Sequence, residues 1–335
     1  MSETTLTRPV DASSAPDAAD LDERLEAHRT ELTGFCYRML GSAFEAEDAV
    51  QETFIRAWRG YDRFEGRAKF RSWLYRIATN VCLDMRGASQ RRARPVDLSA
   101  PGTTAQGLGP PLAEATWIEP VPDDRAIPSG GDPADVAVAR ESIRLAFVAA
   151  LQHLPPRQRA VLILREVLRW KAEEVAELLD TSTASVNSAL QRARSTLATR
   201  DVGARPPDPL DESQRALLDR YVAAFEQYDM DALTNLLHED ASWSMPPYEL
   251  WLQTHPDIRS WCLGPGIGCR DSRLVATTAN GSPAYGQYKP ALGGGWEPWS
   301  LQVVEISGDR ISGITFFLDT ARYFPLFGLP PRLEG

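Results

Sequence analysis

The alternation of apolar and polar positions divides the chain into two helical regions and one mixed region. Apolar residues recur at steps of three and four from about 21 to 90, and again from about 133 to 200. Because this spacing places them along one face of an α-helix, it predicts two helical domains. Gly41 and Gly60 follow the first two apolar stripes and are expected to end those helices.

Beyond residue 211 the pattern changes from helical to strand-like. One or two helices are expected first, followed by strands at 241–245, 270–278, 284–289, 298–306 and 310–318. This order predicts an α+β domain.

Stretches rich in Pro, Gly and small polar residues separate these regions. A structureless loop of this length is uncommon inside a compact domain, so the segment after the first helical region is interpreted as a linker. We therefore divide the chain into a disordered leader at 1–20, a helical domain at 21–95, an acidic Pro/Gly-rich linker at 96–134, a second helical domain at 135–200, a short linker at 201–210 and an α+β domain at 211–335.

Composition restricts the class of protein. Of 335 residues, 43% are hydrophobic and 24% are charged, which is typical of globular chains and excludes wholesale disorder. No stretch approaches the roughly 20 apolar residues that span a bilayer, and residues 1–20 lack the apolar core of a secretory signal. The cysteines are too few and too scattered for a disulfide framework, so we expect a cytoplasmic protein with free thiols. They are Cys36, Cys82, Cys262 and Cys269.

The distribution of charge is more informative than the net charge of −10. Residues 21–95 have a net charge of +3 and residues 140–200 of +4, whereas residues 96–139 have −6 and residues 201–335 have −8. Two basic modules therefore alternate with acidic segments. This polarity indicates that two separate parts of the chain bind a polyanion.

A helix-turn-helix is predicted at residues 172–197. Asp180 stands in the turn, where φ is positive and Gly would be the easiest residue, and Ser182 is a good N-cap for the second helix. That helix has one apolar face and one face of short polar groups and Arg, as a helix in a DNA major groove requires. The polar face consists of Thr183, Ser185, Asn187, Ser188, Gln191, Arg192 and Arg194. On this pattern alone, an ordinary helical hairpin with a solvated face remains the alternative.

Three motifs, in order, resemble one family. Residues 48–58 (DAVQETFIRAW) resemble the core-binding helix of bacterial group IV (extracytoplasmic-function) RNA polymerase sigma factors. Residues 70–80 (FRSWLYRIATN) resemble the promoter-melting helix of the same family's σ2 domain. Residues 154–159 (LPPRQR) and the helix-turn-helix resemble its σ4 domain.

This resemblance implies two sets of site residues in the first helical domain. The residues expected to bind core polymerase are Asp48, Gln51, Glu52, Phe54 and Trp58, although Phe54 and Trp58 must be partly core. Those expected to bind the −10 element are Lys69, Arg71, Trp73, Arg76, Asn80, Asp84 and Arg86. Aromatic rings interleaved with cations are typical of single-strand binding, and the resemblance implies that Asn80 and Asp84 hold a flipped base. The alternative for Asp84 is an ion pair with a neighbouring Arg.

The resemblance also implies that the acidic linker threads through polymerase between the two DNA-binding modules. Residues 117–120 (WIEP) carry large apolar side chains of this linker. We interpret them as a docking motif for polymerase or for the C-terminal domain. A stray aromatic in a disordered linker is the alternative.

Residues 211–335 resemble the NTF2-like (SnoaL-like) cone that some actinobacterial group IV sigma factors carry as a fused extension. This fold encloses a pocket, for which the expected lining residues are Trp243, Met245, Trp251, Trp261, Tyr288, Trp299 and Phe317. Ligand binding, catalysis and purely protein-contacting regulation stay open as roles. No arrangement of His and carboxylates stands out as a catalytic or metal site, so we expect no enzyme activity, no metal and no cofactor.

The leading hypothesis is a sigma factor that recruits core RNA polymerase, binds duplex DNA at −35 and melts the −10 element. Its expected partners are core polymerase, promoter DNA and a small-molecule ligand of the C-terminal domain, with no membrane, and that domain is expected to regulate in cis. The first alternative is a helix-turn-helix regulator with a ligand-sensing domain, which leaves residues 48–58 and 70–86 unused. The second alternative is an enzyme with an appended regulatory region.

Overall fold

The structure is a computed structural model that describes residues 18–64, 66, 69–86, 91–130, 132–199 and 210–334. Most of the predicted leader and nearly all of the predicted linker at 201–210 lie outside these residues. Residues 18–20 of the predicted leader are the start of the first helix. No helix in the described part of the chain is long and apolar enough to cross a membrane.

The first helical domain has the predicted helices. They are α1 (Ala18–Glu26), α2 (Arg29–Leu40), α3 (Ala43–Gly60) and α4 (Phe70–Arg86), with a 3-10 turn η1 (Tyr61–Arg63) after α3. Gly41 ends α2 at a φ of 77°, a left-handed conformation that glycine adopts at no steric cost. Ser42 then caps α3, because its hydroxyl accepts a hydrogen bond from the backbone N–H of Glu45 at 3.1 Å. The two Gly positions that the pattern indicated are therefore the helix ends.

The linker is ordered in short elements and packs against both neighbouring domains. They are α5 (Pro95–Leu98), η2 (Thr104–Gln106), η3 (Glu114–Thr116) and α6 (Asp123–Ala126). Ile118, Val121 and Ile127 belong to the same apolar core as the helices of the first domain. The absence of helical periodicity therefore predicted the absence of long helices correctly, but the segment is docked rather than loose.

The second helical domain contains α7 to α11. Their bounds are α7 (Pro133–Glu141), α8 (Leu145–Leu151), α9 (Pro156–Leu162), a π-helical turn (Ile163–Val167), α10 (Ala172–Leu178) and α11 (Thr183–Leu197). The last two helices are the predicted helix-turn-helix. Asp180 has a φ of 49°, and the Ser182 hydroxyl accepts a hydrogen bond from the N–H of Ser185 at 3.2 Å, so both sequence predictions for the turn are confirmed.

The C-terminal domain is a curved sheet with helices, as expected for the α+β class. Its helices are α12 (Glu212–Glu226), α13 (Met230–Asn235), α14 (His255–Leu263), the 3-10 turn η5 (Pro265–Cys269) and α15 (Thr320–Leu326). Its strands are β1 (Leu237–Ser244), β2 (Trp251–Leu252), β3 (Arg273–Ala279), β4 (Ser282–Pro290), β5 (Trp296–Ser307) and β6 (Arg310–Phe317). The order across the sheet is β2-β1-β6-β5-β4-β3, in which β1 and β6 are parallel and the other pairs are antiparallel.

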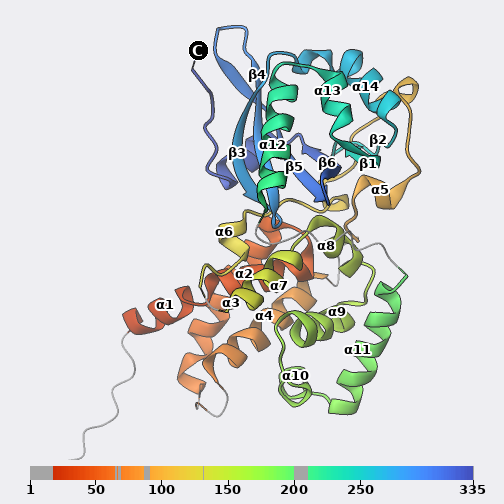
Figure 1. The fold of residues 1–335 in the computed structure, drawn as a ribbon. Helices are drawn as coiled ribbons and strands as arrows, with labels where there is room; N and C mark the ends of the chain where they lie inside the picture. Colours follow the sequence, from red (N-terminus) through yellow and green to blue (C-terminus); the bar gives the residue numbers. More distant parts are fainter. Residues whose placement is uncertain are drawn as a thin grey trace, which may run out of the picture.

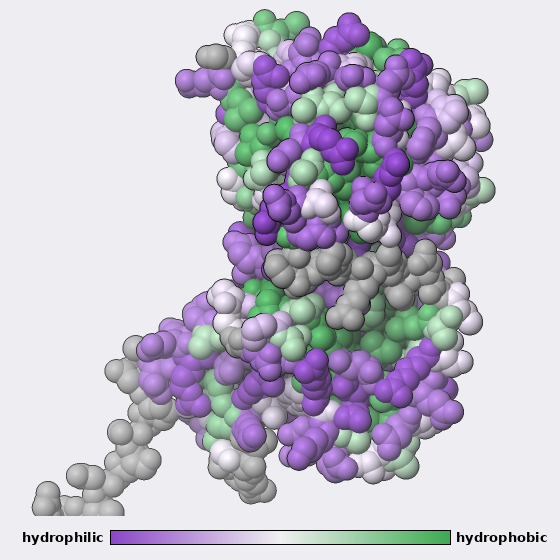
Figure 2. Space-filling model, viewed as in Figure 1, coloured by the Kyte–Doolittle hydropathy of each residue, from purple (hydrophilic) through white to green (hydrophobic). Residues whose placement is uncertain are grey.

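The two faces of this sheet belong to different cores. One face packs against α12, α13 and α14 in a core made almost entirely of C-terminal residues. The other face joins α15, the linker and both helical domains in a second, continuous core. The molecule therefore has two lobes that meet at a waist, with the β3–β4 hairpin pointing from the upper lobe into the lower one (Figures 1 and 2).

Candidate nucleic-acid interface

The polar face of α11 is presented to solvent as a whole. All seven residues predicted for it are exposed, whereas Val186, Leu190 and Ala193 are buried against the rest of the second helical domain. Arg192 donates a hydrogen bond to the Ser188 hydroxyl at 2.9 Å, and Arg194 is paired with Glu166. A helix with this division can enter a major groove without unfolding its domain.

The −10 residues of α4 do not form one free surface. Lys69, Asn80 and Asp84 are exposed. Arg71 is instead paired with Glu31, with its Nη2 atom 2.8 Å from the carboxylate, and Asp84 accepts a hydrogen bond from Arg56 at 3.1 Å. Asp84 therefore has the ion pair with a neighbouring Arg that was the alternative for it. The side chain of Arg86 lies outside the described part of the structure.

An aromatic cluster stands at the start of α4. The rings of Tyr61, Phe64, Phe70 and Trp73 lie with centroids 4.9 to 6.3 Å apart. The guanidinium of Arg24 stacks over the Phe70 ring at 4.1 Å. Half-buried rings beside cations suit the stacking of unpaired bases.

The predicted polymerase face of α3 is partly exposed. Asp48 and Gln51 are exposed, Glu52 is half-exposed and paired with Arg56, and Phe54 is buried. Trp58 is 41% exposed and donates its indole N–H to Asp22 at 3.0 Å. Phe54 therefore lies in the core, whereas Trp58 is only partly covered.

Ile55, 44% exposed, lies on the same face of α3 and was missed by the sequence analysis. Its spacing of four from Gln51 and three from Trp58 is the signal that could have identified it. The two exposed apolar side chains, Ile55 and Trp58, give this face the character of a protein-binding surface.

The two helical domains touch each other through α4 and α10. Arg76 of α4 donates a hydrogen bond to the backbone carbonyl of Glu177 in α10 at 2.8 Å. Tyr75 packs its ring 5.1 Å from that of Trp170, just before α10. Arg76 and Asn80 line a polar crevice of about 430 Å³ whose opposite wall is residues 177–180 of the helix-turn-helix.

The β3–β4 hairpin inserts one asparagine between the linker and both helical domains. The Asn280 side chain is fully buried and adopts a φ of 57°. Its amide nitrogen donates to the Tyr37 hydroxyl at 2.6 Å and to the Ile143 carbonyl at 2.7 Å, and its amide oxygen accepts from the N–H of Val121 at 3.1 Å. Asn280 thus contacts α2, the linker and the turn between α7 and α8 of the second helical domain. We call Asn280 and these three partners the hairpin clasp.

Two carboxylates lie beside the hairpin clasp, one fully buried and one partly buried. Glu119 is fully buried, accepts a hydrogen bond from the Ser42 hydroxyl and pairs with Arg322 of α15 at 3.2 Å. Burial raises the pKa of the Glu119 carboxyl above its ordinary value. Asp123 accepts a hydrogen bond from the N–H of Gly281 at 2.7 Å, and burial raises its pKa to about 6. The apolar linker segment 117–120 is therefore docked between the first helical domain and the C-terminal domain.

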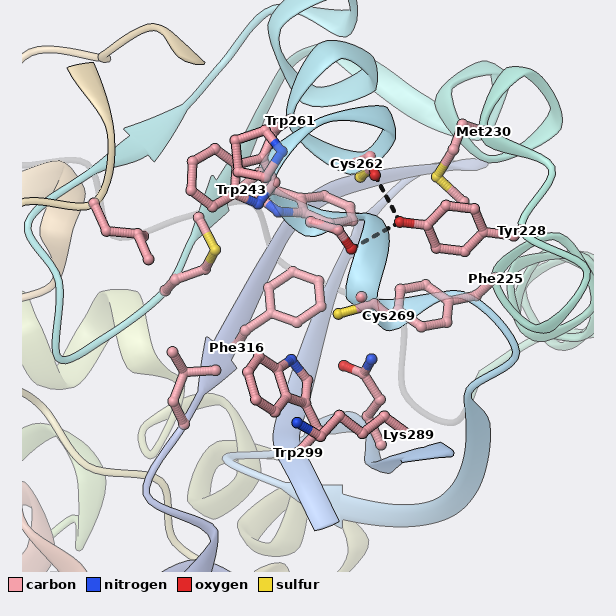
Figure 3. Close-up of a pocket in the computed structure, with 17 residues that line it drawn as sticks. Phe225, Tyr228, Met230, Trp243, Trp261, Cys262, Cys269, Lys289, Trp299 and Phe316 are labelled. Carbon is pink, nitrogen blue, oxygen red and sulfur yellow. Dashed lines mark hydrogen bonds between the residues drawn. The ribbon is translucent and has the colours of Figure 1, made fainter. Parts of the chain in front are cut away.

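The C-terminal domain holds a mainly apolar cavity of about 270 Å³ between its sheet and its helices (Figure 3). Four of the predicted residues line it, namely Trp243, Met245, Trp261 and Trp299.

Trp251, Tyr288 and Phe317 do not line this cavity. Tyr288 and Phe317 face the other side of the sheet, where Tyr288 packs against Phe324 with ring centroids 5.1 Å apart. Trp251 donates its indole N–H to the carbonyl of Ser99 in the linker at 3.0 Å. Because successive residues of a strand face opposite sides, Phe316 takes the cavity position and Phe317 does not.

Exposed polar and basic helices on two separate helical domains, one of them a helix-turn-helix, define a DNA-binding transcription factor with a fused α+β domain. The model of Sigma-70 region 2 matches residues 25–92, and that of Sigma-70, region 4 matches residues 144–197. The chain is 46% identical over 320 residues to the ECF RNA polymerase sigma factor SigG of Mycobacterium tuberculosis, covering 94% of this chain and 85% of that protein.

Other similar proteins are sigma factors of the same type. The ECF RNA polymerase sigma factor SigW of Bacillus subtilis is 31% identical over 176 residues, covering 52% of this chain and 84% of that protein. The crystal structure of the M. tuberculosis extracytoplasmic function sigma factor SigJ has the same fold, with a TM-score of 0.60 at 22% identity over 92% of this chain and 100% of that one. The chain belongs to the extracytoplasmic-function sigma factors, the subunits that give RNA polymerase its promoter specificity. Its partners are core RNA polymerase and promoter DNA.

Proposed function

We propose that this sigma factor is regulated in cis, by a closed state in which its own linker and C-terminal domain hold the two DNA-reading domains together. The observation that carries the proposal is the hairpin clasp, because the fully buried Asn280 binds the linker and both helical domains at once. The chain acts by binding and not by catalysis, at the chromosome in the cytoplasm.

We assign each exposed set of residues on α3, α11 and α4 to one partner of a sigma factor. Asp48, Gln51, Ile55 and Trp58 bind core polymerase through the exposed face of α3. The polar face of α11 reads the −35 duplex. Arg76 and Asn80, with the aromatic cluster at the start of α4, bind the unpaired −10 strand.

Promoter geometry requires the closed state to open. The −35 and −10 elements lie roughly 25 base pairs apart, which is roughly 85 Å of duplex at about 3.4 Å per base pair. Each helical domain has a radius of gyration of only about 11 Å by its length. Domains that touch through Arg76 and Glu177 therefore cannot occupy both elements.

The linker is long enough to allow this opening, but only when it leaves the C-terminal domain. Residues 96–134, fully extended, can reach roughly 130 Å at about 3.3–3.6 Å per residue. In the closed state the linker is held by the Glu119–Arg322 pair and by the Asp123–Gly281 hydrogen bond. When these contacts break, the linker can extend far enough for the two helical domains to bind the −35 and −10 elements at the same time.

The test compares Arg322→Gln with Arg220→Gln, an exposed Arg of the same domain whose one printed hydrogen bond stays within its own helix. Arg322 contacts Glu114, Glu119 and the Phe44 ring, so its loss leaves the buried Glu119 carboxylate without its cation. Run-off transcription with purified core polymerase should rise several-fold for Arg322→Gln and stay at the original level for Arg220→Gln. Equal transcription by all three proteins, at matched folded fractions, would reject regulation by this closed state.

A further inference from the structure

We propose that the cavity of the C-terminal domain binds a planar aromatic acid of about two fused rings, and that the bound acid holds the linker in its docked position. The effect of the acid on the linker rests on the closed state proposed above. The binding of the acid rests on the cavity alone.

The aromatic side chains that line the cavity favour a planar, apolar ligand. The rings of Phe225, Trp243, Trp261 and Phe316 are buried in the protein and face the cavity from α12, β1, α14 and β6 (Figure 3). At about 270 Å³ the cavity lies just below the range of about 300–1,000 Å³ that is usual for ligand pockets, so it suits a small molecule of a few rings. Aromatic walls favour stacking with an aromatic ligand over an aliphatic chain.

One wall of the cavity carries a positive charge. Lys289 places its ammonium 4.0 Å from the centroid of the Trp299 ring, which is 38% exposed. Its carboxylate neighbour, Glu297, lies at 3.4 Å, a loose pair at the surface. A ligand acid placed here would exchange that loose pair for a charge-assisted hydrogen bond.

Two further donors remain for oxygen atoms of the ligand. Within the described residues, the indole N–H groups of Trp243 and Trp261 have no acceptor, although both side chains are buried beside the cavity. Gln287, in contrast, already exchanges hydrogen bonds with Ser272, Ser300 and Gln302. These two indole N–H groups are therefore free to donate hydrogen bonds to oxygen atoms of a ligand in the cavity.

One wall of the cavity comes from the linker rather than from the C-terminal domain. Leu108 lines the cavity between Gly107 and Gly109, which have φ values of 66° and 68° and give the chain the bend that inserts this side chain. On either side, the N–H of Gly102 donates to the Trp251 carbonyl at 2.8 Å and that of Leu112 to the Pro247 carbonyl at 2.9 Å. A ligand in contact with Leu108 therefore binds the docked linker more tightly than the released one, and by linkage it stabilises docking.

The binding test uses full-length protein with 2-naphthoate and its uncharged counterpart 2-naphthamide, titrated by calorimetry. Naphthoate should bind at least tenfold more tightly than naphthamide, and Lys289→Gln should abolish that difference, while Lys171→Gln, a lysine outside the cavity, should keep it. Cys269→Phe, which places a ring in the cavity, should weaken both compounds. Absence of binding, or a preference for naphthoate that survives Lys289→Gln, would overturn the site.

The coupling test uses hydrogen exchange at the Gly102 and Leu112 amides. Saturating naphthoate should slow their exchange severalfold, and Leu108→Ala should weaken naphthoate binding while Leu98→Ala, an exposed linker leucine, should not. Unchanged exchange at saturation would overturn the coupling. Naphthoate should also lower run-off transcription by the original protein and not by Lys289→Gln. Binding and slowed exchange without any change in transcription would contradict the regulatory closed state and leave the ligand site standing.

Discussion

Replacing Asn280 with glycine isolates the contribution of the hairpin clasp. Asn280 adopts a φ of 57°, which glycine accepts without strain, so Asn280→Gly keeps the hairpin and removes only the side chain. Alanine at this position would add strain of roughly 1–2 kcal/mol that acts on the C-terminal domain whether it is docked or not. Glycine is therefore the cleaner perturbation.

The free energy that Asn280→Gly removes from the closed state can be estimated from the groups that lose a hydrogen-bond partner. The N–H of Val121 and the carbonyl of Ile143 each lose a hydrogen bond to a fully buried amide. An unsatisfied buried polar group costs about 1–3 kcal/mol, so the closed state should lose about 2–6 kcal/mol. Even about 3 kcal/mol is more than a hundredfold in the closed-to-open ratio.

The assay measures the affinity for core polymerase, because apparent affinity rises with the fraction of sigma factor in the competent state. Asn280→Gly should bind core polymerase more tightly than the original protein, and small-angle scattering of the free variant should give a larger radius of gyration. Asn235→Gly, at an exposed position in α13, is the matched control and should behave as the original protein in both measurements. A folded Asn280→Gly variant with unchanged scattering and unchanged polymerase affinity would refute the reasoning. Deleting the C-terminal domain is a poorer test, because the deletion would also strip the shared core.

Four further outcomes are expected. Arg192→Ala should weaken −35 binding by about 1–3 kcal/mol on the cognate sequence and not on a scrambled one, measured by mobility shift; an equal loss on both would mean phosphate contact only. Asn80→Ala should leave −35 binding unchanged and lower the permanganate reactivity of unpaired −10 thymines, and normal strand opening would remove Asn80 from the −10 site. Asp48→Lys should abolish holoenzyme formation while duplex −35 binding persists, so undiminished holoenzyme would contradict the α3 assignment. Because burial in the closed state raises the pKa of Asp123 to about 6, the closed state binds the proton more tightly, so lowering the pH from 7 to 5 should stabilise the closed state by roughly 1 kcal/mol, an effect that thermal unfolding should show and Asp123→Asn should reduce.

Local features of the sequence predicted most of the secondary structure. Ser182 and Asp180 were identified by the backbone conformation and hydrogen bond that each position needs, and both predictions are confirmed. Gly41 identified a helix end in the same way. These features depend on residues within a few positions of each other, which is why the sequence alone reveals them.

Contacts between distant segments were not predictable in this way. Alternation along β6 shows that Phe316 and Phe317 face opposite sides, but not which side holds the cavity. The partners of Asn280 stand 243 and 137 positions away, at Tyr37 and Ile143. A linker that is polar, acidic and rich in Pro and Gly has the composition of a loose segment, and only its burial against two domains orders it.

The hairpin clasp lies late in the chain, and this has a consequence for the newly made protein. Both DNA-reading domains are complete by residue 199, whereas Asn280 and Arg322 are synthesised afterwards. At about 5–20 residues per second, the ribosome takes roughly 6–25 s to travel from the end of the helix-turn-helix to Arg322. During that interval each nascent sigma factor has both helical domains but not yet the residues that would close them. If the closed state forms as proposed, a molecule still attached to its ribosome should be open, and only the finished chain can close.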